Sequence, residues 1–220
     1  MNRIFFVFLC KYLKVIFRKS LFNFGAVSVH LMTFTEFDTA NYLDKLTDIE
    51  KERYFSFSNA YRRQEFVATR LLRHDIFGHQ HIHYDAVGAP LIEGEGFISI
   101  SHSKNIVGIA ICSDFKVGLD VEAIRSKMNA IKHKFVSTEE FESLDCDSEQ
   151  ILTMIWTGKE SLYKVSGTKS INFRTELFLN RMDTNKWIGR IEMNNLNLKT
   201  ELNIFEYENC IISINTAACE

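Results

Sequence analysis

The first regular pattern in the chain predicts an amphipathic helix over residues 59–77. Val67 and Leu71 are four residues apart and so lie on one side of a helix, as core-facing positions do. Gly78 follows at once, and glycine is the usual residue just past a helix end because it adopts left-handed backbone angles easily. An apolar, β-branched stretch over residues 26–34 predicts a strand before this helix.

Three strand-like segments come next, over residues 97–101, 106–112 and 117–122. The links between them are short and polar, which favours an antiparallel meander. The middle segment is apolar on both faces, so we expect it to be the buried strand with the other two beside it.

A second long helix is predicted over residues 148–165, where apolar residues recur at helical spacing, and a shorter helix is expected to begin near Ser137. A strand over 187–193 and a hairpin over 201–217 follow. A helix followed or preceded by strands thus occurs twice. We therefore expect an α+β fold of two similar halves, each an antiparallel sheet packed with helices.

The composition is that of a globular protein, with 46% hydrophobic and 25% charged residues among 220. A formal net charge of −2 argues against a nucleic-acid-binding protein, which would normally carry a basic excess. The cysteines number five and show no CxxC spacing, so a disulfide framework and a cysteine zinc site are both disfavoured. We expect reduced thiols in a cytoplasmic protein.

The first twenty residues differ from the rest because they carry five basic and no acidic side chains. Their apolar stretch is too short to span a bilayer, so no membrane association is expected. A targeting segment is the weaker alternative, because no clear small-residue cleavage site follows the stretch. We predict a basic, apolar N-terminal extension over residues 1–24, an N-terminal half over 25–112 and a C-terminal half over 113–220.

Candidate chemistry begins in the segment 117–122, where the side chains alternate between two faces. Asp120 and Glu122 share one face with Gly118, whose missing side chain would let a bulky cofactor approach. Two such carboxylates suit a hard cation such as Mg²⁺, which also takes water and substrate phosphate as ligands. An isolated acid pair of this kind is also common on the solvated face of an edge strand.

The long helix 148–165 adds Glu160 and Lys164, four residues apart on its polar side. They suit a third carboxylate ligand and an ammonium that neutralises phosphate. The alternative is an ordinary surface ion pair at this helical spacing.

The segment Ser99-Ile-Ser-His-Ser103 places a histidine between hydroxyls where a strand meets a turn. Such a histidine can bind phosphate, although a capped turn explains it equally well. A serine hydrolase is disfavoured because no nucleophile elbow is present.

Taken together, these segments resemble the 4'-phosphopantetheinyl transferase family in order and spacing, and in length the larger, surfactin-synthetase-activating type. The matching segments are Gly88-Ala-Pro90, Phe97-Ile-Ser-Ile-Ser-His-Ser103, Val117-Gly-Leu-Asp-Val-Glu122 and Trp156-Thr-Gly-Lys-Glu-Ser-Leu-Tyr-Lys164. The resemblance implies two halves in one polypeptide (a pseudo-dimer), with the active site between them. It also implies transfer of the 4'-phosphopantetheine arm of coenzyme A to a serine of an apo acyl or peptidyl carrier protein by a monomer. Adenosine 3',5'-bisphosphate is released.

The resemblance also assigns roles to single residues. Mg²⁺ would be held by Asp120, Glu122 and Glu160. Coenzyme A would be bound by the remaining matched positions, which are Arg53, Gly88, Ser101, His102 and Lys164. Ala89 departs from the pattern, because the family usually carries Lys or Arg there, and Gly158 is an unexpected glycine within a helix, explicable by close packing against the cofactor.

Glu140 matches a glutamate proposed in the family to deprotonate the carrier serine, a catalytic role shared with Lys164. Ser137-Thr-Glu-Glu140 is also a capping box, in which the same carboxylate would bond a helix N-terminus.

Two other functions remain open at this stage. Alternate histidines at His79, His81 and His83 could bind zinc in a metal hydrolase. A module that binds carrier protein or coenzyme A without catalysis is the other.

Overall fold

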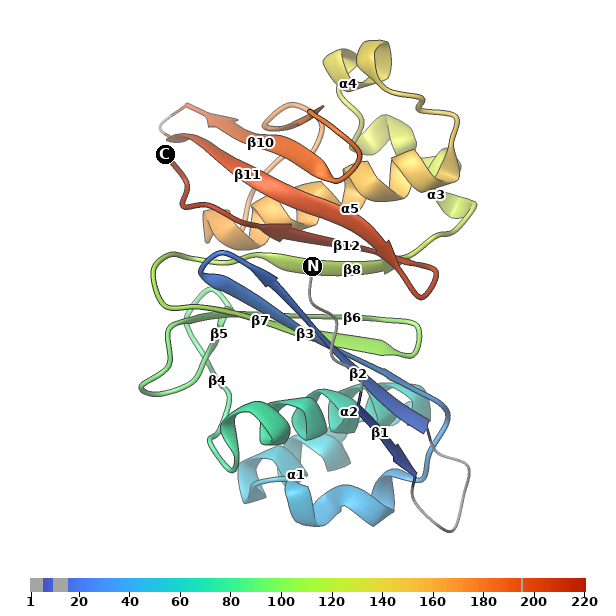
Figure 1. The fold of residues 1–220 in the computed structure, drawn as a ribbon, viewed down its shortest axis with the longest axis vertical. Helices are drawn as coiled ribbons and strands as arrows, with labels where there is room; N and C mark the ends of the chain where they lie inside the picture. The colour runs from blue at the N-terminus through green and yellow to red at the C-terminus, as the bar shows by residue number, and fades with distance from the viewer. Residues whose placement is uncertain (1–5, 10–15, 195) are drawn as a thin grey trace.

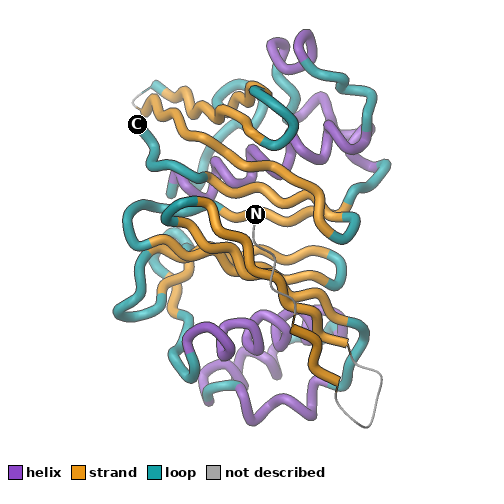
Figure 2. The backbone as a smooth tube through the Cα atoms, in the orientation of Figure 1, coloured by secondary structure: helices purple, strands orange, loops and turns teal. Residues whose placement is uncertain are grey.

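The computed structural model of the chain describes residues 6–9, 16–194 and 196–220. Two five-stranded antiparallel sheets lie at the centre, and each is covered by helices on its outer side (Figure 1). In Figure 2 the strands occupy the middle of the molecule and the helices its two ends. The expected α+β class is confirmed. The structure does not test whether the halves are two copies of one unit, and the domain limits stay a prediction.

The first sheet has the strand order β1-β2-β3-β7-β6. Its strands are β1 (Phe6–Leu9), β2 (Ile16–Phe24), β3 (Val27–Phe34), β6 (Phe97–Ser103) and β7 (Ile106–Cys112). A two-stranded ribbon adjoins it, made of β4 (His83–Tyr84) and β5 (Pro90–Leu91). The helical elements of this half are η1 (Thr39–Lys45), α1 (Asp48–Ser56) and α2 (Ala60–Phe77).

The second sheet has the strand order β8-β12-β11-β10-β9. Its strands are β8 (Leu119–Ala123), β9 (Leu177–Arg181), β10 (Lys186–Met193), β11 (Leu196–Tyr207) and β12 (Cys210–Asn215). The helical elements of this half are α3 (Lys127–Ile131), η2 (Lys132–Lys134), α4 (Thr138–Ser143) and α5 (Glu149–Ser166). None of the described helices is both long and apolar enough to cross a membrane.

Local sequence explains where the two long helices begin and end. The Asn59 and Ser148 side chains each accept a hydrogen bond from the first turn of α2 and α5. Gly78 and Gly167 end the helices with φ of 62° and 66°. Both predicted helices are confirmed to within a residue or two.

Apolar side chains fill three layers between these elements. One cluster lies between the two sheets and includes Leu31 from the first sheet and Val121 and Ile212 from the second. The others lie between the first sheet and α2 and between the second sheet and α5. Each sheet therefore has apolar side chains packed on both of its faces, and this constrains the register of its strands.

The predicted meander of three consecutive strands is wrong in its third member. β6 and β7 pair as expected, but the other side of β7 is taken by β3, which comes from far earlier in the chain. β8 pairs instead with β12 and forms the edge of the second sheet. The two sheets therefore meet where β6 and β8 run beside each other (Figure 1).

Gly118 and Gly158 serve packing within the protein, which corrects the expectation that they make room for a cofactor. A Cβ on Gly118 would lie 2.1 Å from the backbone oxygen of Ser161, so this glycine lets α5 approach the start of β8. A Cβ on Gly158 would meet side chains of Leu179 and Ile204 at 2.7 and 2.9 Å. Gly118 therefore sets how closely α5 approaches β8, whereas Gly158 leaves room for two side chains of the second sheet.

Residues 16–24 fall within the predicted N-terminal extension, whose limits stay a prediction. They form β2, which pairs with β3 from Phe17 to Phe24. Phe22 is buried between the sheets, and the hydroxyls of Ser20 and Tyr207 lie 2.8 Å apart. The basic side chains of Arg3, Lys11 and Lys14 lie outside the described residues.

Candidate active site

Asp120 lies at the seam between the two halves, on β8. It is 6% exposed, and its Oδ1 accepts hydrogen bonds from the Ser101 hydroxyl at 2.9 Å and from Lys164 Nζ at 2.8 Å. Lys164 also donates to the carbonyl oxygen of Leu119. The other oxygen, Oδ2, is buried and has no hydrogen-bond partner among the described residues. A buried carboxylate oxygen in that state is costly unless a donor or cation reaches it.

Glu122 and Glu160 surround Asp120 with further negative charge. Burial, followed by the charge of Asp120, raises the pKa of Glu160 to about 7. The same two causes raise the pKa of Glu122, although Arg125 pairs with it at 2.9 Å. The negative charges of the three carboxyl groups therefore act on one another.

These features fit a divalent cation that takes few protein ligands. The described residues contain no group of three or more acidic, histidine or cysteine side chains gathered tightly enough to hold a metal ion alone. Mg²⁺ differs from zinc or calcium in this respect, since it keeps several waters and takes substrate phosphate oxygens. The unpartnered Oδ2 of Asp120 and the raised pKa values are what such an ion would relieve. The ligand assignment itself stays a prediction.

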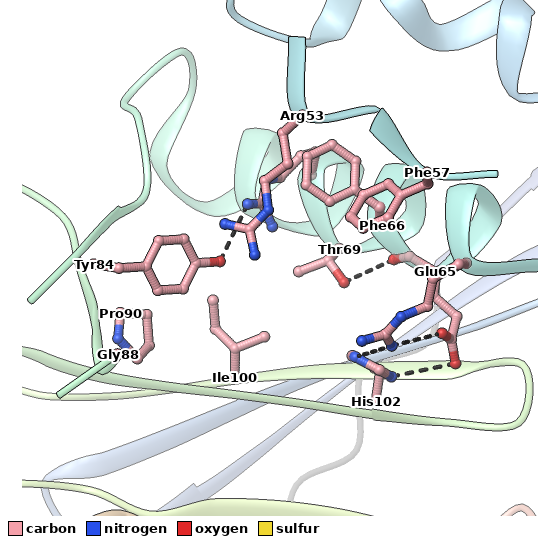
Figure 3. Close-up of a pocket in the computed structure, with 12 residues that line it drawn as sticks. Arg53, Phe57, Glu65, Phe66, Thr69, Tyr84, Gly88, Pro90, Ile100 and His102 are labelled. Atoms are coloured by element: carbon pink, nitrogen blue, oxygen red, sulfur yellow. Dashed lines mark hydrogen bonds and ion pairs between the residues drawn. The ribbon is translucent and has the colours of Figure 1, made fainter. Parts of the chain in front are cut away.

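A second feature is a pocket of about 210 Å³ on the other side of β6 (Figure 3). Its walls come from α1, α2, the β4–β5 ribbon and β6. The lining residues are Arg53, Phe57, Arg62, Glu65, Phe66, Thr69, Arg70, Tyr84, Gly88, Pro90, Ile100 and His102. The structure thus brings together three of the predicted cofactor-binding residues, namely Arg53, Gly88 and His102.

One wall of the pocket carries a small charged network. Nδ1 of His102 lies 3.2 Å from Oε1 of Glu65 (Figure 3). Arg62 contacts both residues at 3.1 Å. Burial alone would raise the pKa of Glu65, but His102 and then Arg62 hold that pKa below its usual value. The network fixes the His102 ring at the pocket wall.

The opposite wall holds two guanidinium groups beside an aromatic ring. Arg53 lies over the Tyr84 ring with its central carbon 5.0 Å from the ring centroid. Arg70 donates to the Tyr84 hydroxyl at 3.2 Å and also pairs with the buried Glu50. This wall is suited to an anionic ligand that carries a flat group.

Ser101 does not line this pocket, although the resemblance assigns it to cofactor binding. Successive side chains of a strand point to opposite faces, so His102 faces the pocket while Ser101 faces β8. Its hydroxyl contacts Asp120 and the backbone amide of Val121. The two sites are therefore separated by the thickness of one strand.

Glu140 lies away from both sites, within the core under α5. The capping box is present, and its carboxylate accepts hydrogen bonds from the amides of Ser137 and Leu179 and from Lys159. Glu140 and Lys159 both have 0% side-chain exposure. These contacts account for Glu140 without a catalytic role, and its role as a base stays a prediction.

Comparison with known families bears on the second half of the chain. Residues 116–209 match the family model of the 4'-phosphopantetheinyl transferase superfamily. The region of this superfamily match runs from just before β8 into the last turn and contains all four of Asp120, Glu122, Glu160 and Lys164. The pocket residues lie before it. No curated protein matches the chain.

The match supports phosphopantetheine transfer as the general class of activity. The surfactin-synthetase-activating type within the superfamily stays a prediction.

The histidines that suggested a zinc hydrolase do not form a metal-holding group. The rings of His81 and His83 lie 4.7 Å apart, but Nδ1 of His81 lies 3.2 Å from the hydroxyl of Thr47. The hydrolase hypothesis therefore has no support in the geometry.

Several residues that line the pocket could not be found from the sequence, among them Arg62, Glu65, Arg70 and Tyr84. Arg62 and Glu65 lie three apart near the start of α2, and that i, i+3 spacing was the available signal for their contact. Arg70 and Tyr84 gave no signal, because their contact depends on how the β4–β5 ribbon folds back over α2.

Proposed function

We propose that this protein transfers the 4'-phosphopantetheine arm of coenzyme A to a serine of an apo acyl or peptidyl carrier protein. The reaction depends on Mg²⁺ and releases adenosine 3',5'-bisphosphate. The protein would act as a monomer, because the carboxyl groups around Asp120 and the pocket beside His102 occur in one chain.

The observation that carries the proposal is the charge distribution at the seam. Three mutually repelling carboxyl groups and one ammonium, that of Lys164, lie one strand away from a pocket with guanidinium groups. Coenzyme A has a pyrophosphate in its middle and a 3'-phosphate at its adenosine end. An elongated anion of this kind suits a cation site adjoining a basic pocket.

We assign the adenosine end of coenzyme A to the pocket. Arg53 is exposed at the pocket wall, and its guanidinium can bond a phosphate by two parallel hydrogen bonds. Gly88 has φ of 91°, and a Cβ there would meet nothing within 4 Å, so its backbone borders open space that a ligand can occupy. His102 faces the same space.

Lys169 can replace the basic side chain that is absent at Ala89. Its Nζ donates to the carbonyl oxygen of Ala86 at 2.9 Å, so the ammonium lies at the turn that holds Gly88. Lys169 comes from just after α5, in the other half of the chain. A phosphate bound at this turn would thus still meet a lysine.

The chain's own residues would act on the reaction by position and charge. Asp120, Glu122 and Glu160 would hold Mg²⁺, which would supply positive charge next to the pyrophosphate. Lys164 would hold a positive charge beside the phosphorus at which the carrier serine attacks. The serine oxygen forms a new P–O bond, the P–O bond to adenosine 3',5'-bisphosphate breaks, and the serine proton passes to a water molecule. His102 would stabilise the phosphate charge from the pocket side.

The first prediction concerns Glu160→Gln. This change removes a ligand charge and relieves repulsion at Asp120, so we expect normal folding and a loss of transfer by at least about 100-fold. Apo carrier proteins of several kinds would be incubated with coenzyme A and Mg²⁺, and their intact mass followed with and without chelator.

The matched control is Glu142→Gln, an exposed carboxylate on α4, which should transfer at the wild-type rate. Wild-type-like transfer by Glu160→Gln would refute the metal assignment. Binding of apo carrier by the wild-type chain with no mass gain on any carrier would refute the enzyme and favour a binding module.

A further inference from the structure

The seam between the two halves is held by three serine hydroxyls. Ser99, Ser101 and Ser103 alternate along β6 and so point to one side of the strand. Their hydroxyls accept hydrogen bonds from the backbone amides of β8, at 2.9, 3.1 and 3.0 Å in that order. The amide donors belong to Leu119, Val121 and Ala123. Side-chain oxygens thus replace the carbonyl groups that a neighbouring strand would provide.

The three serines are equivalent in this role, but Ser101 makes one more contact. Its hydroxyl proton is donated to Oδ1 of Asp120 at 2.9 Å while its oxygen accepts the Val121 amide. Among the described residues, neither Ser99 nor Ser103 has a hydrogen bond to a carboxylate. Ser101 is 7% exposed, so solvent does not compete for this bond.

The second bond to the same carboxylate oxygen comes from Lys164 at 2.8 Å. Two donors on Oδ1 fix the rotation of the carboxylate about its own axis. Oδ2 is consequently buried, and no residue in the described part of the chain donates a hydrogen bond to it. Oδ1 is held by two hydrogen bonds, and Oδ2 remains available to a ligand.

We infer that Ser101 is a positioning residue, which holds the Asp120 carboxylate so that Oδ2 is presented to the metal ion. The inference rests on the proposed function, because it assumes that Asp120 binds the ion. It differs from the cofactor contact that family resemblance implies for Ser101. Residues that orient a metal ligand in this way commonly change metal affinity 10- to 100-fold when removed.

The test compares Ser101→Ala with Ser99→Ala. Both variants remove one buried hydroxyl from β6 and leave one β8 amide without its acceptor, so their melting temperatures should fall by similar amounts. Only Ser101→Ala also frees the Asp120 carboxylate. Binding would be measured directly with Mn²⁺ as a probe, from the loss of the free-ion electron paramagnetic resonance signal.

We expect the Mn²⁺ dissociation constant to rise at least about 10-fold in Ser101→Ala and less than about 2-fold in Ser99→Ala. In the transfer assay, the Mg²⁺ concentration for half-maximal rate should rise in the same proportion, with KM for coenzyme A little changed. If Ser101→Ala does not fold, Ser101→Cys fills the same volume with a weaker donor and should also bind Mn²⁺ less tightly.

Equal Mn²⁺ affinity in the two alanine variants would overturn the inference while leaving the proposed function in place. Absence of Mn²⁺ binding by the wild-type protein, together with no transfer, would overturn both.

Discussion

Glu140 and Lys159 form an ion pair with no side-chain exposure, and each also bonds other parts of the core. Lys159 donates to the carbonyl oxygens of Phe135 and Phe173 at 2.6 and 2.8 Å. Burial lowers the pKa of Lys159, and the charge of Glu140 opposes that effect. The pair therefore joins α4, α5 and β9 at a single point.

Glu140→Gln tests whether this residue serves structure or catalysis. Removing one charge of a buried pair leaves the other uncompensated, so we expect the free energy of unfolding to fall by about 3–5 kcal/mol. Lys159→Met should cost a similar amount. Chemical denaturation of both variants measures this.

A catalytic base predicts a different pattern for the same two variants. Glu140→Gln would then unfold like the wild type and lose transfer activity, whereas Lys159→Met would remain active when folded.

Sequence supplied the chemistry of single residues better than their partners. Alternation in a strand predicts that Asp120 and Glu122 share a face, and helical spacing predicts the same of Glu160 and Lys164. That the two pairs lie near each other was implied only by the family resemblance. The contact between Ser101 and Asp120 joins β6 of the first sheet to β8 of the second, so no local rule could predict it. The same holds for Lys159 as the partner of Glu140.

At the scale of elements, the approach of α5 to β8 depends on Gly118. The helix brings Glu160 and Lys164 to Asp120, and a side chain at Gly118 would strike the helix backbone at Ser161. Gly158, on the same helix, meets only the ends of the Leu179 and Ile204 side chains. A side chain at Gly118 would thus displace the backbone of α5, whereas a side chain at Gly158 would displace only side chains.

Gly118→Ala is therefore expected to move α5 outward, with a stability loss of about 1–3 kcal/mol or more and a loss of transfer activity. Gly158→Ala, the matched variant, gains about 1 kcal/mol of helix propensity against its clash and should stay close to wild type in both properties. Unfolding and transfer assays on both variants measure this. Equal behaviour of the two would contradict the role given to Gly118.

The limits of the two long helices could be predicted closely, because each helix end depends on a residue next to it. These residues are Asn59, Gly78, Ser148 and Gly167. Strand pairing could not be predicted. β8 and its partner β12 are separated by most of the second half, and β3 reaches β7 across α1 and α2. Alternation shows which residues of a strand face a core, but it does not show which strand lies beside it.

At the scale of the whole molecule, β2 connects the two halves. The Phe22 ring lies between the sheets, with its centroid 5.1 Å from that of Phe205 and 5.5 Å from that of Tyr207. The basic, apolar start of the chain suggested an extension, because sequence alone does not show that β2 pairs with β3 in the first sheet.

Phe22→Ala should lower the free energy of unfolding by about 3–5 kcal/mol, since it empties a buried aromatic site that both halves share. Asn23→Ala, at the exposed neighbouring position, should change it by less than about 0.5 kcal/mol. Denaturant titration of the two variants gives the comparison. A Phe22→Ala protein as stable as the wild type would show that the halves associate without β2.

The serine-lined seam also bears on how the protein avoids aggregation. β6 and β8 are the outermost strands of their sheets, and bare backbone amides along such a strand can recruit a strand from another molecule. In β8, the amides of Leu119, Val121 and Ala123 are already occupied by hydroxyls from within the same chain. The alternate serines that join the halves therefore also make these β8 amides unavailable to a strand from another molecule. The two sheets remain separate, because the acceptors are side-chain hydroxyls and not backbone carbonyl groups.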